Sequence, residues 1–123
     1  MHAIVGRYEV AGNGHGYLGL LNKGKYDLYP IDITGAIPGI RNTVVAGIND
    51  EYDIVGSYSL NGVSHGFTWK VDEATGKTVG IPTPNVDYPG SQGTLITSID
   101  YHGSFSGYFT DAGGLRHAFR FEL

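Results

Sequence analysis

The chain contains no cysteine among its 123 residues, so disulfide bridges and thiolate metal sites are excluded. Charged residues are scarce, at 16%, and the 8 basic residues are scattered singly along the sequence. The formal net charge is -4. A nucleic-acid partner would require a cluster of basic residues, and we therefore expect no nucleic-acid binding.

Long apolar runs and helical periodicity are missing as well. The longest apolar runs, such as residues 43–48, are far shorter than the roughly 20 residues that cross a bilayer, so no membrane insertion is expected. Met1 leads almost directly into a strand-like segment, and we predict no signal peptide in this chain. No stretch keeps apolar residues at helical spacing for more than two turns, which argues against a long helix.

Glycine and tyrosine are the residues in excess, with 20 and 9 copies. Glycine is poor in helix interiors, whereas tyrosine suits the pleated, half-buried surface of a sheet. A chain of this length fits one domain. The composition therefore predicts a single all-β domain over residues 1–123, with no cofactor.

A short pattern recurs three times at a spacing of about 50 residues. Each copy has a glycine in an apolar strand-like segment and, nine or ten residues later, a histidine that precedes Gly or Ala and then an aromatic residue. The glycines are Gly6, Gly56 and Gly107, and the histidines are His15, His65 and His117. We divide the chain into repeat 1 (about 4–53), repeat 2 (about 54–104) and a half repeat (about 105–123).

Each full repeat reads as four strands, and the chain enters after the first strand of a unit and leaves after the third, which predicts about ten strands. His65 and Phe67 alternate with Gly66 and Thr68, so we expect one core face and one solvent face. Glycine weakens a strand. Its recurrence at one position of each hairpin predicts that a ring or a backbone atom crowds that position.

The unpaired edge strands can be covered in two ways. About two and a half four-stranded units cannot close a propeller ring, which needs at least about four blades. We therefore predict an antiparallel β-barrel or sandwich of about ten strands, which hides its edges within one chain. The alternative is a set of propeller-like blades closed by oligomerisation, in which case the protein is a homo-oligomer.

Several segments match the motifs of a known repeat family. They are Ile-Val-Gly at 4–6 and 54–56, Gly-Ile-Asn at 47–49, Asp-Tyr-Pro-Gly at 87–90 and His-Ala-Phe at 117–119. At these residues the chain resembles the extracellular repeat family called HAF. The resemblance implies an extracellular or cell-surface location and, in longer members, a propeller-like arrangement.

The repeated histidines are the sharpest chemical feature. If the repeat brought His15, His65 and His117 together, a three-histidine zinc site would be reasonable. We predict instead a structural role for each and no metal site, because each follows a turn and precedes an aromatic residue by two positions. Asp32 and Asp87 occupy equivalent positions and could pair for glycoside hydrolysis, but hydrogen bonds to backbone at the same turn explain both.

Aromatic residues near loops are candidates for a binding surface, because a rigid ring with a polar atom suits recognition of sugars or proteins. These candidates are Tyr29, Tyr52, Tyr88, Tyr101 and Trp69. The leading hypothesis is a non-enzymatic binding or surface-interaction module for a glycan or protein ligand. One alternative is a small β-barrel enzyme, an isomerase, cyclase or hydrolase, that acts on an apolar ligand in an aromatic-lined interior. Another is a structural, self-assembling repeat; no catalytic residue is assigned.

Overall fold

The computed structural model describes residues 3–33 and 38–122, which form ten β-strands in three antiparallel sheets. Sheet 1 contains β1 (Ala3–Val10), β2 (Asn13–Asn22) and β3 (Lys25–Ile31). Sheet 2 contains β4 (Ile40–Ile48), β5 (Asp53–Leu60), β6 (Val63–Val71) and β7 (Thr78–Thr83). Sheet 3 contains β8 (Gly93–Ile99), β9 (Phe105–Thr110) and β10 (Arg116–Phe121). These ranges include no helix that could cross a membrane.

The three copies of the repeated hairpin have the same strand register. Each repeated glycine lies opposite the aromatic residue that follows its histidine by two positions: Gly6 opposite Tyr17, Gly56 opposite Phe67 and Gly107 opposite Phe119. The tight turn between β5 and β6 has positive φ at Asn61 and Gly62, as a two-residue hairpin requires. The predicted all-β class, the number of strands and the incomplete first and last units are confirmed.

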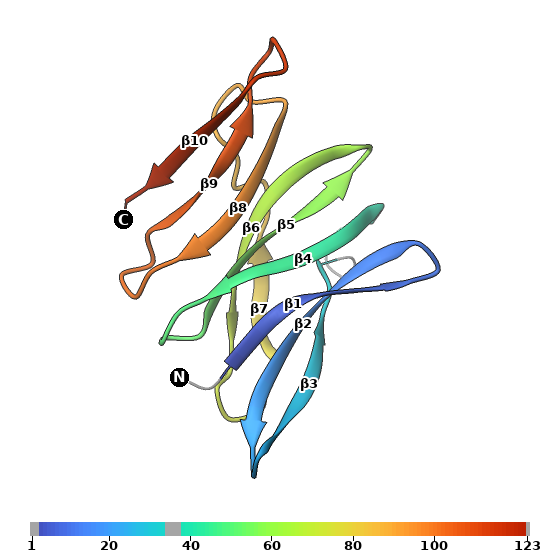
Figure 1. Cartoon of the computed structure of the whole chain (residues 1–123), viewed down its shortest axis with the longest axis vertical. Coiled ribbons are helices and arrows are strands. Elements are labelled where there is room, and N and C mark those ends of the chain that lie inside the picture. Colours follow the sequence, from blue (N-terminus) through green and yellow to red (C-terminus); the bar gives the residue numbers. More distant parts are fainter. Residues whose placement is uncertain (1–2, 34–37, 123) are drawn as a thin grey trace.

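The sheets follow one another along the molecule, with sheet 2 between the other two (Figure 1). We call the side of each sheet that carries His15, His65 or His117 its histidine face. The opposite side, which carries Gly16, Gly66 or Ala118, is its glycine face. The histidine face of sheet 2 packs on the glycine face of sheet 1, and Phe67 joins Leu18 in one buried cluster. The histidine face of sheet 3 packs on the glycine face of sheet 2, where Phe119 borders a smaller cluster around Val55.

The described strands do not close into a barrel, so that form of the prediction is wrong, whereas the sandwich-like form, with several antiparallel sheets, is confirmed. A barrel requires hydrogen bonds between its first and last strands, and here the strands pair only within three separate sheets. The expectation of one solvent face per sheet is also wrong for sheet 2. Both Gly66 and Phe67, which point to opposite sides of β6, are buried, because sheet 2 is covered on both faces.

The repeated glycines are crowded, as predicted. A Cβ added to Gly6 would lie 2.9 Å from the ring of Tyr17. At Gly56 and Gly107 it would overlap the carbonyl oxygens of Val44 and Leu95, which belong to the neighbouring strands β4 and β8. Both neighbouring strands carry a register irregularity close to that contact.

Alanine at Gly56 should therefore destabilise the fold by about 1–3 kcal/mol, because the overlapping Val44 oxygen is backbone and cannot rotate away. Gly93 is a matched control in β8. Its added Cβ would lie 3.8 Å from the nearest heavy atom, and its φ is not positive, so Gly93→Ala should be neutral or slightly stabilising. Urea unfolding of both variants measures the difference, and equal free energies of unfolding would contradict the packing described here.

Candidate functional site

Each repeated histidine stacks on an aromatic ring of the preceding strand. The ring centroids are 5.3 Å apart for Tyr8 and His15, 5.5 Å for Tyr58 and His65, and 5.1 Å for Phe109 and His117. In every case the two residues lie directly opposite each other in the hairpin register. The stacked ring is thus the cross-strand neighbour, whereas the sequence pointed to the aromatic residue two positions along the same strand.

Each histidine also bonds to an aspartate. The distances from ring nitrogen to carboxylate oxygen are 3.0 Å for His15 and Asp32, 2.6 Å for His65 and Asp87, and 2.7 Å for His117 and Asp111. In sheets 1 and 2 the aspartate follows the last strand of the sheet, β3 or β7. Within residues 38–122 no fourth strand pairs with β10, and in sheet 3 the turn between β9 and β10 supplies the carboxylate instead.

The three pairs lie in three different sheets, so the repeated histidines do not converge on one point. The described part of the chain holds no group of three or more His, Asp or Glu side chains in a metal-binding arrangement. In sheets 1 and 2 the pair attaches the segment after β3 or β7 to the neighbouring strand, β2 or β6. Each pair is a local contact, as the predicted structural role requires.

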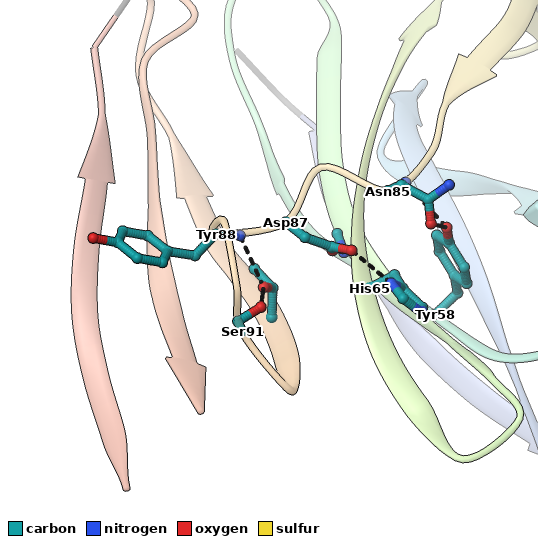
Figure 2. A network of polar contacts seen from close by, with 8 residues as sticks. Tyr58, His65, Asn85, Asp87, Tyr88 and Ser91 are labelled. Carbon is teal, nitrogen blue, oxygen red and sulfur yellow. Dashed lines mark hydrogen bonds and ion pairs between the residues drawn. The ribbon is translucent and has the colours of Figure 1, made fainter. Parts of the chain in front are cut away.

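Figure 2 shows how the segment after β7 is fastened to sheet 2. Asp87 accepts hydrogen bonds from His65 and from the backbone N–H of Gly66 at 3.0 Å. The Tyr58 hydroxyl donates to the Asn85 side chain and accepts from its backbone N–H, both at 3.1 Å. The backbone bond expected for the repeated aspartates is therefore present at Asp87.

The same segment then continues onto sheet 3. The backbone N–H of Tyr88 donates to the Thr94 hydroxyl at 3.1 Å, and Ser91 bonds to that hydroxyl at 2.9 Å (Figure 2). The Tyr88 ring lies parallel to the Phe109 ring, with centroids 3.8 Å apart. The segment thus joins the two sheets and forms one wall of the space between them.

That space is a groove of about 950 Å³ between sheets 2 and 3. Its lining is largely apolar and comes mainly from β6, β7, the segment after β7, β9 and β10. Residues of this lining include Val79, Ile81, Val86, Phe105, Phe119 and Phe121. Ile81 is 88% exposed, and Val79 and Phe121 are about half exposed, so the groove presents apolar side chains to solvent.

Four of the charged side chains that line the groove have partners. Lys70 lies 3.3 Å from Asp53, and Arg120 lies 3.6 Å from Asp100. The carboxylate of Asp87 is held by His65. The apolar side chains are therefore the main chemical resource of the groove, which suits binding better than proton transfer.

Two of the five predicted aromatic residues border this groove. Tyr88 does so with its ring against Phe109. Trp69 does so from β6, but its side chain packs against the buried cluster between sheets 1 and 2, and its Nε1–H donates to the Gly80 carbonyl at 3.2 Å. The indole is thus held within the fold.

The other three aromatic residues lie elsewhere and are not brought together. Tyr52 packs against the cluster between sheets 1 and 2, and burial raises its pKa, with the charges of Glu73 and Asp50 adding to the effect. The Tyr29 ring lies against Gly76. Tyr101 is exposed and contacts the His102 ring, with centroids 4.0 Å apart.

The aliphatic groove residues were missed by the sequence analysis. Val79 and Ile81 both line the groove from β7, and that strand also contains Pro82. Proline within a strand marks the edge of a sheet, because it cannot donate a ladder hydrogen bond. This signal places Val79 and Ile81 at an edge and could have identified them as accessible apolar residues.

Comparisons with models of known protein families, with curated proteins and with solved structures find no match for this chain. The functional interpretation therefore depends on the groove, the strand edges and the polar network described above.

Replacement of Asp87 by alanine should cost about 1–3 kcal/mol of stability, because the buried Gly66 N–H loses its acceptor. Asp50→Ala is a matched control in an exposed turn and should change stability by less than about 0.5 kcal/mol. Thermal and urea unfolding followed by circular dichroism measure both. Equal effects of the two variants would show that the network does not fasten the segment.

Alkaline pH should weaken the fold through Tyr58. Its pKa is raised above the ordinary value of 10.0, chiefly by burial and to a smaller extent by Asp87, while the Asn85 backbone bond opposes the rise. The neutral phenol therefore favours the folded state, and this contribution is complete below pH 10.0 and is lost as pH rises through the folded pKa. Tyr58→Phe should show a shallower alkaline loss of melting temperature than wild type, whereas Tyr101→Phe should match wild type.

Proposed function

We propose that this protein is a non-enzymatic binding module that accepts an extended, apolar segment of another polypeptide in the groove between sheets 2 and 3. One observation carries the proposal. The groove is lined in part by β10, and within the described residues the outer edge of β10 has no strand paired to it. In sheets 1 and 2 the equivalent edge is paired with β3 or β7.

An unpaired strand edge offers backbone N–H and C=O groups to an incoming strand. A peptide that adds to β10 would have alternate side chains directed to one side, toward the groove. There Phe119 and Phe121 on β10 lie across from Ile81 on β7. Main-chain hydrogen bonds would give affinity, and the apolar groove would select hydrophobic residues at alternate positions.

The groove favours a polypeptide over a glycan. Sugar binding relies on open aromatic faces bordered by polar groups, but one face of Tyr88 is covered by Phe109 and the partly buried Trp69 side chain packs against the core cluster. The most exposed large hydrophobic residue of the lining is the aliphatic Ile81. Burial of such side chains by an apolar peptide removes hydrophobic surface from water, which a polar sugar would do less well.

The enzyme hypothesis relied on a ligand inside a barrel, and the described strands do not form a barrel interior. Membership of the HAF-like repeat family, with an extracellular or surface location, is part of the proposal. It is supported by the three hairpins of equal register and by the repeated pairing of histidine with aspartate.

A synthetic peptide of residues 24–32 is a suitable probe, because β3 pairs with β2 in an unbroken register and so represents a fourth strand of this fold. We expect saturable binding by fluorescence anisotropy. Binding should weaken at least about tenfold in Ile81→Asp and Phe121→Asp, because a charge would be buried in the groove. Leu115→Asp is the control, since Leu115 is exposed and does not line the groove.

The proposal would be contradicted by the absence of saturable binding, or by equal binding in Ile81→Asp and wild type. A peptide with proline at alternate positions cannot donate ladder hydrogen bonds and should not bind. If it binds as well as the parent peptide, strand addition is excluded. Binding of a glycan with loss in Ile81→Asp, and no binding of the peptide, would replace the polypeptide by a sugar ligand.

A further inference from the structure

The histidine face of sheet 1 is an apolar surface that no other sheet covers within the described residues. Exposed large hydrophobic side chains gather on it from all three strands of the sheet. They are Ile4, Tyr8 and Val10 on β1, Leu21 on β2, and Tyr26 and Leu28 on β3, and their exposed fractions run from 38% to 64%.

The strand registers place these residues on one side. Ile4 lies opposite Gly19, which lies opposite Leu28. A Cβ added to Gly19 would meet the side chains of Ile4 and Leu28 at 2.8 and 3.0 Å, so both close over the glycine. Tyr26 and Leu21 form the next pair on this side. The two sides of the sheet are thus chemically different.

No Asp, Glu, Lys or Arg of β1, β2 or β3 lies on this face. The charged residues Arg7, Glu9 and Asp27 alternate with it and belong to the glycine face, as their partners Gly16, Gly14 and Leu20 show. On the histidine face, a ring nitrogen of His15 bonds to the carboxylate of Asp32. The face is uncharged apart from that pair.

The equivalent faces of the other two sheets are covered. In sheet 2 the histidine face, with Tyr58 and Phe67, is buried under sheet 1. In sheet 3 the face with Phe105 and Phe119 packs toward sheet 2. Sheet 1 thus has the side-chain composition of a packing face, and within residues 3–33 and 38–122 nothing packs on it.

We propose that this face binds the same face of a second copy of the chain, in a dimer with two-fold symmetry. The other outward surface of the stack is the glycine face of sheet 3. It carries Arg116, placed 4.9 Å over the Tyr108 ring. The uncharged face of sheet 1 offers this cation no partner, so burial of that surface against it would be costly. Contact between two identical apolar faces avoids this cost.

The geometry of the stack supports the same choice. In sheets 2 and 3 the close approach to the preceding sheet is made by the first strand of the unit, β4 or β8. Within the described residues, sheet 1 has no strand in that position. Packing of the kind found inside the chain would therefore lack its closest contact, whereas two apolar faces of sheet 1 need only interlock their side chains.

The size of the face sets the expected affinity. Three strands of about eight residues present roughly 15 by 27 Å, which is on the order of half the 800 Å² per partner of a standard interface. The dimer should therefore be weak. Sedimentation velocity and light scattering from about 10 μM to about 1 mM cover the range in which such an interface assembles.

Three variants test the proposal. Leu28→Lys and, independently, Tyr26→Lys place a charge on the face at an already exposed position, so both should fold and remain monomeric. Ala118→Lys alters the glycine face of sheet 3 and should dimerise like wild type. Peptide binding at the groove should be unchanged in Leu28→Lys, so the dimer and the proposed function are tested separately.

Concentration-dependent dimerisation that is lost in Leu28→Lys and Tyr26→Lys, with unchanged circular dichroism, supports the proposal. Wild type that stays monomeric up to about 1 mM would overturn it. Association that survives both lysine variants would overturn it as well. Loss in Ala118→Lys together with Leu28→Lys would show contact between unlike ends of the stack and would replace the symmetric dimer by a head-to-tail assembly.

Discussion

The contact between successive sheets depends on the absence of a side chain at one residue of β2 and at the equivalent residue of β6. A Cβ at Gly16 would lie 2.8 Å from Val45 of sheet 2, and one at Gly66 would lie 2.5 Å from Ile96 of sheet 3. Because both positions are glycine, the first strand of the next sheet approaches the backbone closely, and large side chains fill the space on either side. The third unit has Ala118 at this position, and no further sheet packs there within the part of the chain described.

Much of the fold could be predicted because the same hairpin pattern occurs three times in the sequence. The shared spacing from glycine to histidine fixed the register, and the crowding at Gly56 followed from it. Alternation along a strand says which side a residue occupies, but not which sheet covers that side. For this reason the packing of Trp69 against the cluster between sheets 1 and 2 was not expected, and the partner of each histidine, such as Asp111, was not foreseen.

The two proposed surfaces differ in chemistry and lie on different sheets. The groove and the free edge of β10 belong to sheets 2 and 3 and are bordered by paired charges such as Lys70 and Asp53. The apolar face belongs to sheet 1 and has no charged strand residue. Since neither surface uses residues of the other, a ligand and a second copy could be bound at the same time, and dimerisation would present two grooves to one multivalent partner.

All strand pairs in the described sheets join neighbours in the sequence, so β1 pairs with β2, β2 with β3, and so on within each sheet. No hydrogen-bonded ladder in these residues has to wait for a distant part of the chain. Loop closure is therefore short, and assembly can spread from one hairpin to the next. The same arrangement permits growth by duplication: an extra unit of about 50 residues between two sheets would interrupt packing at one contact and leave every existing ladder intact.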